Sequence, residues 1–181
     1  RYQSMPYRQY KSNPTVAMAT DFQMFIANLD SVGYDTQYSC HIENMSNDWT
    51  FDYTSDECYL SPYANNGFQD CNGSNATQAC PHLKNFLFEM DNSVDTASFL
   101  ITHIISVETN LPDVKGDTMR GVQRFSDYYA YDDGTPERGY GVVPDDSYFA
   151  TQFSVSMPDT LCGVQLLFNR THNDANYDFF D

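Results

Sequence analysis

Five cysteines carry the most recognisable chemistry in this sequence. Cys162 stands apart, whereas Cys40, Cys58, Cys71 and Cys80 lie in or near a segment rich in glycine, asparagine and serine. No Cys-x-x-Cys spacing and no histidine pair indicates a zinc site. The four clustered cysteines are therefore disulfide candidates, which is typical of an exported protein. Four cysteines allow three pairings, and proximity in the sequence favours Cys40–Cys58 and Cys71–Cys80.

Cys162 is the fifth cysteine of an otherwise paired set. It alternates with Val164, Leu166 and Phe168, which indicates one face of a strand. This pattern predicts a buried free thiol that packs as a small apolar side chain. The alternative is a bond to a partner beyond the C-terminal end of the sequence.

Catalytic and metal chemistry has weak support in the sequence. Cys80 and His82 lie close together, but alternate residues of a strand do not by themselves form a catalytic triad. Asp132 and Asp133 are weak candidates for a calcium site, and solvated turn acids are the simpler interpretation. His103 alternates with isoleucines, so we expect it half-buried and hydrogen-bonded. We expect no enzyme activity, no cofactor and no metal.

Aromatic residues are the better candidates for ligand binding. Tryptophan and tyrosine rings stack on sugar rings, while neighbouring Asp and Asn side chains accept hydrogen bonds from sugar hydroxyls. Such a platform is predicted at Trp49 or at Tyr129, Tyr131 and Tyr140. The alternative is that these rings fill a core or cover turns.

The elements that position these residues read as strands. Apolar residues alternate with polar ones in residues 15–29, 38–42, 49–53 and 149–157. Residues 98–107 also read as a strand, but apolar residues lie on both of its faces, so we expect both faces to be covered. Residues 81–90 fit a helix or a strand, and the neighbouring strands favour a strand. We predict an all-β fold: an Ig-like sandwich at 1–126 with a Cys-rich loop region, then a truncated, jelly-roll-like sandwich at 127–181.

Charge narrows the choice of partners. The chain has 25 acidic and 9 basic residues, a net charge of -16, so it repels phosphate backbones and anionic lipid. We therefore expect no nucleic acid, and no apolar run is long enough to span a membrane. The opening lacks the apolar region of a signal peptide and the end lacks a closing turn. We expect a fragment of a longer protein.

One segment resembles a known family. Tyr129–Thr135, Glu137 and Gly139–Gly141, followed by Phe168–Thr171 and Asn173–Asn176, are similar to a β-sandwich module of large secreted proteins of Bacteroidota. The resemblance covers about the last third of the chain. It implies export by the type IX system and a place at the extracellular or outer-membrane surface. It brings no catalytic residues with it.

The resemblance also gives meaning to a repeated triplet. Asp, then Ser or Thr, then a small or aliphatic residue is the O-glycosylation pattern of that phylum, and composition alone gives roughly one such triplet. Here the candidate acceptors are Ser31, Thr96, Thr118 and Thr160.

The sequence thus predicts a non-catalytic structural or adhesion module of an exported bacterial surface protein. Its expected partners are other surface or outer-membrane proteins, type IX secretion components and glycans. The alternatives are a carbohydrate-binding module and an accessory domain of a secreted hydrolase.

Overall fold

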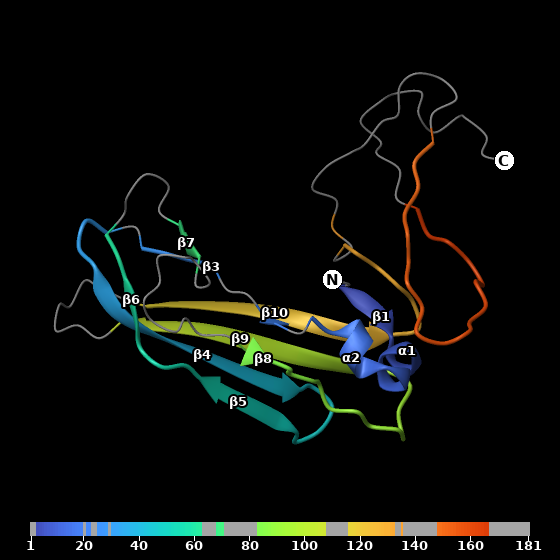
Figure 1. Cartoon of the computed structure of the whole chain (residues 1–181). Coiled ribbons are helices and arrows are strands. Elements are labelled where there is room, and N and C mark those ends of the chain that lie inside the picture. Colours follow the sequence, from blue (N-terminus) through green and yellow to red (C-terminus); the bar gives the residue numbers. More distant parts are fainter. Residues whose placement is uncertain are drawn as a thin grey trace.

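The computed structural model describes residues 3–19, 21–22, 25–28, 30–62, 68–70, 83–107, 116–132, 135 and 148–166 (Figure 1). These residues form ten strands and two short helices, which confirms the predicted all-β class. The Ig-like and jelly-roll details stay predictions, as does the division of the chain at residue 126. In the described part of the chain, no helix is long and apolar enough to cross a membrane.

One sheet, here called the main sheet, contains six of the strands. Its order is β1-β10-β9-β4-β5, and β6 also pairs with β4. Every pairing is antiparallel except that of β1 with β10, which is parallel. The bounds are β1 Ser4–Pro6, β4 Tyr34–Asn44, β5 Thr50–Thr54, β6 Cys58–Leu60, β9 Ala97–Val107 and β10 Asp117–Ser126.

Two small ribbons and two helices complete the described elements. β2 (Asp21–Phe22) pairs with β8 (Leu83–Lys84), and β3 (Phe25–Ala27) pairs with β7 (Phe68–Asp70). The helices are α1 (Tyr7–Ser12) and α2 (Pro14–Ala17), and both lie beside the β1 end of the main sheet (Figure 1).

The prediction of one strand across residues 15–29 is therefore wrong in its first part. Pro14 occupies the first turn of α2, a position where a missing N–H costs nothing. Val16 lies in that helix and is 63% exposed. Only β2 and β3 remain of the predicted strand.

Alternation in β4 is confirmed and defines the inner face of the main sheet. Tyr38, Cys40 and Ile42 are buried there, and their neighbours in the sequence are not. Trp49, Phe51 and Tyr53 pack partly against the same core. The fully or almost fully buried cluster comprises Met5, Tyr7, Tyr10, Tyr38, Cys40, Ile42, Phe86, Phe88, Ala97, Phe99 and Phe125.

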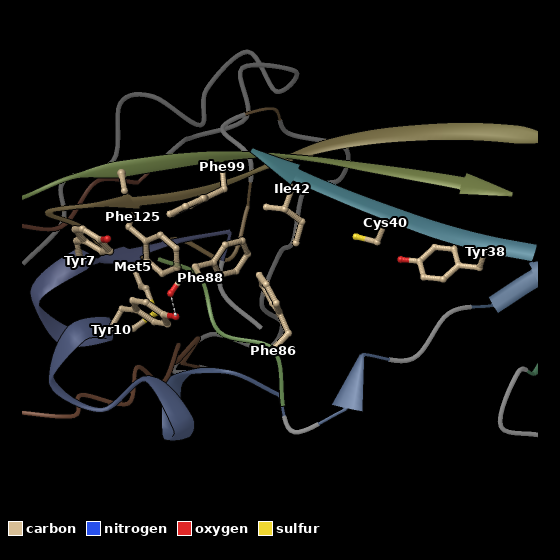
Figure 2. Packing of buried hydrophobic residues seen from close by; sticks show 11 residues of the cluster. Met5, Tyr7, Tyr10, Tyr38, Cys40, Ile42, Phe86, Phe88, Phe99 and Phe125 are labelled. Atoms are coloured by element: carbon tan, nitrogen blue, oxygen red, sulfur yellow. Dashed lines mark hydrogen bonds between the residues drawn. The ribbon is translucent and has the colours of Figure 1, made fainter. Parts of the chain in front are cut away.

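Aromatic rings dominate this core. Figure 2 shows Tyr10, Phe88, Phe99 and Phe125 gathered between α1 and the main sheet. The centroids of Tyr10 and Phe125 are 4.5 Å apart, and those of Phe88 and Phe99 are 4.8 Å apart. Both pairs are tilted, which is a favourable arrangement of ring quadrupoles. The Tyr10 hydroxyl also donates to the Phe88 carbonyl at 3.0 Å, so its polar end is satisfied.

Residues 81–90 contain much less strand than predicted. The strand ends at Lys84, because Asn85 adopts a left-handed backbone with φ of 54°. Phe86 and Phe88 are nevertheless buried, so the alternation is kept without a hydrogen-bonded ladder. Inward-facing rings, rather than backbone pairing, hold this segment on the core.

Residues 148–166 contain no strand, so the predicted strand at 149–157 is also wrong. Phe149 is 72% exposed, and Val155 is exposed as well. Cys162 is exposed too, which corrects the prediction of a buried thiol. A two-residue period leads to a strand only where the edge of a sheet offers backbone hydrogen bonds to the segment. Within the described ranges, residues 148–166 do not pair with such an edge.

Candidate functional site

The side of the main sheet opposite the core, here called the outer face, carries side chains from four of its strands. The register places its side chains in three rows that cross β5, β4, β9 and β10. The rows are Thr54–Ser39–Ile104–Thr118, Asp52–His41–Thr102–Arg120 and Thr50–Glu43–Leu100–Val122. The residues from β5, together with Thr118 and Arg120, are exposed, as is Ile104.

The outer face carries opposite charges on its two sides. Asp52 of β5 and Glu43 of β4 lie on one side, whereas Arg120 and Arg124 of β10 lie on the other. Among the described residues, no ion pair joins the two sides, because β9 separates Glu43 from β10 and both β4 and β9 separate Asp52 from it. This separation gives the face an acidic half and a basic half.

A histidine lies within the acidic half. The Nδ1 atom of His41 is 2.7 Å from Oδ1 of Asp52, and its Nε2 atom is 3.8 Å from Oε2 of Glu43. The sequence analysis did not single out this cluster: His41 and Glu43 alternate on β4, and the register of β4 with β5 places Asp52 beside His41. The Asp52 side chain is largely exposed, so the pair contributes little to stability.

A second polar pair is buried beneath the same strands. Tyr38 and His103 are hydrogen-bonded through the hydroxyl and Nδ1 at 2.8 Å, and their rings are stacked. Burial lowers the pKa of His103 and raises the pKa of Tyr38. His103 was expected to be half-buried and hydrogen-bonded; the hydrogen bond is confirmed, and the side chain is buried more deeply than expected.

The favoured Cys40–Cys58 disulfide is not present. Both residues are buried, but Cys58 pairs with Thr36, four residues from Cys40 along β4. At about 3.3 Å per residue the two Cα positions are roughly 13 Å apart along the strand. A disulfide needs Cα atoms within about 7 Å. Cys71 and Cys80 lie outside the described residues, so the Cys71–Cys80 pairing stays a prediction.

All four candidate O-glycosylation residues are exposed: Ser31, Thr96, Thr118 and Thr160. Three of these Ser and Thr residues share a local geometry. In each, the backbone N–H of the Ser or Thr donates a hydrogen bond to the side chain of the preceding aspartate. The N···O distances are 2.6 Å at Ser31, 2.7 Å at Thr118 and 2.8 Å at Thr160. The aspartate thus fixes the local backbone of the acceptor residue.

The aromatic candidates for ligand binding do not form one platform. Trp49 is half-buried, and its ring lies edge-on to Phe99 with centroids 5.6 Å apart, as a core residue does. Tyr129 is half-buried, and Tyr131 is stacked on Phe153 with centroids 5.3 Å apart. Tyr140 lies outside the described residues. The structure brings Tyr129 and Tyr131 together through Phe153, which the sequence did not single out.

The metal candidates gain no support from geometry. Asp132 is exposed, and Asp133 lies outside the described residues. The described residues contain no group of three or more His, Cys, Asp or Glu side chains placed to hold an ion. Cys80 and His82, the pair weighed for nucleophilic chemistry, also lie outside them.

Gln9 is a polar residue that the sequence analysis overlooked. It lies in α1, is 0% exposed, and uses its whole side-chain amide to hold residues 156–159. Its Oε1 accepts from the backbone N–H groups of Ser156 and Met157 at 2.8 and 3.0 Å. Its Nε2 donates to Asp159 Oδ2 at 2.9 Å and to the Met157 carbonyl at 3.1 Å.

Asp159 also pairs with Arg8, the residue before Gln9. The hydrogen bond from Gln9 lowers the pKa of Asp159, and that from the Thr160 N–H lowers it further. Two features of the sequence could have predicted α1: Pro6 directly precedes it, and Tyr7 and Tyr10 have the three-residue spacing of one helix face.

Comparison of the chain with protein-family models, with curated proteins and with solved structures gave no match.

Proposed function

We propose that this chain is a non-catalytic structural or interaction module of an exported bacterial surface protein that works within a larger assembly. The observation that carries the proposal is the outer face, which is four strands wide and carries exposed side chains on β5, β9 and β10. Its side chains are mostly short hydroxyls and aliphatics, with charges toward both sides. Such a surface is suited to contact with another protein rather than to enclosing a small substrate.

The candidate glycosylation residues add a second argument. An exported surface protein presents its acceptor hydroxyls to solvent, and all four candidates are exposed. The repeated hydrogen bond from the acceptor N–H to the preceding aspartate supports a common recognition element at Ser31, Thr118 and Thr160. The resemblance at Tyr129–Thr135 supports the same origin.

The proposal is tested on the protein isolated from its own cells. Intact mass before and after reduction, with peptide mapping, is expected to show hexose on at least one candidate residue. Protease added to intact cells is expected to remove the protein, while a cytoplasmic marker survives. A bare chain that resists protease until the cells are lysed contradicts a surface role.

A carbohydrate-binding module is the second candidate, and one observation favours it. Tyr131 and Phe153 form a stacked pair that is still 46% and 44% exposed, and the exposed Tyr128 is close by in the sequence. Open aromatic rings of this kind bind sugar faces. A glycan array with wild-type protein and Tyr131→Ala tests it, with Tyr59→Ala as a control for loss of another exposed tyrosine. Specific binding that only Tyr131→Ala abolishes makes this the primary function.

A further inference from the structure

The arrangement of charges on the outer face is self-complementary. Asp52 and Arg120 lie in the same row, at opposite ends of the four strands. Between them lie His41 and Thr102, which carry no fixed charge. One end of this row is acidic and the other is basic. A second copy, turned so that the two ends exchange places, therefore presents a basic end to the acidic end of the first copy. We infer that two copies of this chain associate through their outer faces, as a two-layered β-sandwich.

The direction of the two-fold axis follows from the register. An axis parallel to the strands keeps each row at its own height and exchanges the β5 side with the β10 side. It therefore places Asp52 of one copy opposite Arg120 of the other, and the symmetry makes this pair twice. An axis perpendicular to the strands sets β10 against β10 and brings like charges together. Only the first arrangement is electrostatically favourable.

The same axis gives reasonable partners to the other two rows. Ile104 faces Ser39, and Leu100 faces Glu43 close to the centre of the interface. Aligned sheets pack about 10 Å apart with strands rotated by about 30°, so these contacts are neighbours rather than an exact match. Ile104 and Leu100 thus lie near the centre together with His41 and Glu43, and the Asp52–Arg120 ion pairs lie at the two sides.

The area of the outer face indicates how tightly two copies can associate. Four strands about 4.8 Å apart and about seven residues long cover roughly 450 Å² in projection. Two copies then bury roughly 900 Å², slightly less than the roughly 1,000 Å² of a stable specific interface, which indicates a weak association. We therefore expect a dissociation constant in the micromolar range. The inference rests on the proposed interaction role, for which it names the partner as a second copy.

Thr118 connects this inference with glycosylation. It lies on the outer face opposite Ile104 in β9, so a sugar there keeps the two faces apart. Ser31, Thr96 and Thr160 lie outside the three rows. Glycosylated Thr118 and an assembled dimer therefore exclude each other.

The test is sedimentation of the unglycosylated 181-residue chain over a concentration series. Wild type is expected to dimerise, and Asp52→Arg or Arg120→Asp is expected to weaken dimerisation tenfold or more. Mixing these two variants restores both ion pairs within a heterodimer, so the mixture is expected to dimerise about as tightly as wild type. Asp56→Arg, at an exposed position between β5 and β6, matches the charge change of Asp52→Arg and is expected to behave as wild type.

Two results overturn the inference. One is a wild-type chain that stays monomeric to several hundred micromolar. The other is a dimer that both variants retain, or that mixing does not restore although circular dichroism shows each variant folded. A monomeric chain leaves the proposed surface role intact, because the mass and protease experiments do not depend on self-association.

Discussion

The hydroxyl of Tyr38 and Nδ1 of His103 are 2.8 Å apart, and both side chains are buried on the inner face of the main sheet. They come from β4 and β9, which are adjacent strands. The ring centroids are 6.0 Å apart and the planes differ by 19°. This pair puts a polar contact inside an otherwise aromatic and aliphatic core, so its loss is expected to affect stability more than an exposed hydrogen bond does.

Tyr38→Phe tests the contribution of this hydrogen bond. The substitution keeps the ring but removes the hydroxyl, so we expect the free energy of unfolding to fall by about 1–2 kcal/mol. Urea denaturation measures the change. Tyr34→Phe is the matched control, because its hydroxyl bonds Asp30 at the exposed surface. If Tyr34→Phe lowers the free energy of unfolding as much as Tyr38→Phe does, burial does not strengthen the hydrogen bond of Tyr38 and the prediction is wrong.

Stability is expected to fall as the pH drops below about 6.5. Burial lowers the pKa of His103 in the folded protein, so the unfolded chain takes up the proton first. The loss begins near the ordinary histidine pKa of about 6.5 and ends at the lowered pKa of the folded state. His103→Asn removes this titration. The difference in unfolding free energy between wild type and variant is therefore expected to change between about pH 7.5 and pH 5.5; a constant difference contradicts the prediction.

Gln9→Ala is expected to release residues 156–159 from α1. The variant loses all five side-chain hydrogen bonds to Ser156, Met157 and Asp159, so we expect a loss of about 2 kcal/mol and faster hydrogen exchange at the Ser156 and Met157 amides. Gln9→Glu keeps the accepting oxygens but adds a charge beside Asp159, so its effect on these amides is expected to be smaller. Unchanged exchange in Gln9→Ala shows that other contacts hold the segment.

Thiol labelling is expected to separate Cys162 from Cys40. Cys162 is exposed, whereas Cys40 is buried and burial raises the pKa of its thiol. Because the thiolate is the reactive form, iodoacetamide is expected to modify Cys162 in the native protein and Cys40 only after unfolding. Peptide mass spectrometry gives the order. Equal rates at the two positions contradict the burial of Cys40.

Alternation predicted β4, which has neighbours on both sides in the main sheet, and also the edge strand β5. Tyr38, Cys40 and Ile42 share the inner face as expected, because β4 lies in the middle of the sheet and one face of it is covered by the core. The same reasoning placed His103 on that face. In such a strand, every second side chain is buried in the structure, and the apolar residues recur at the same two-residue period in the sequence.

Other patterns needed information that the sequence does not contain. Phe149 and Val155 alternate as in a strand, yet they are exposed in a segment held by Gln9. Proximity in sequence paired Cys40 with Cys58, whereas the register separates them along β4. The Asp52–Arg120 row of the candidate site could not be predicted either, because it depends on the same strand pairings.

The parallel pairing of β1 with β10 also governs the order in which the chain can fold during synthesis. Ser4 lies beside Arg124, 120 positions later in the chain. Synthesis proceeds from the N-terminus, so β1 must wait for β10 to leave the ribosome, while β4 and β5 can pair much earlier. Contacts between such distant segments slow folding. A chain that ends before Phe125 therefore lacks most of the strand with which both β1 and β9 pair.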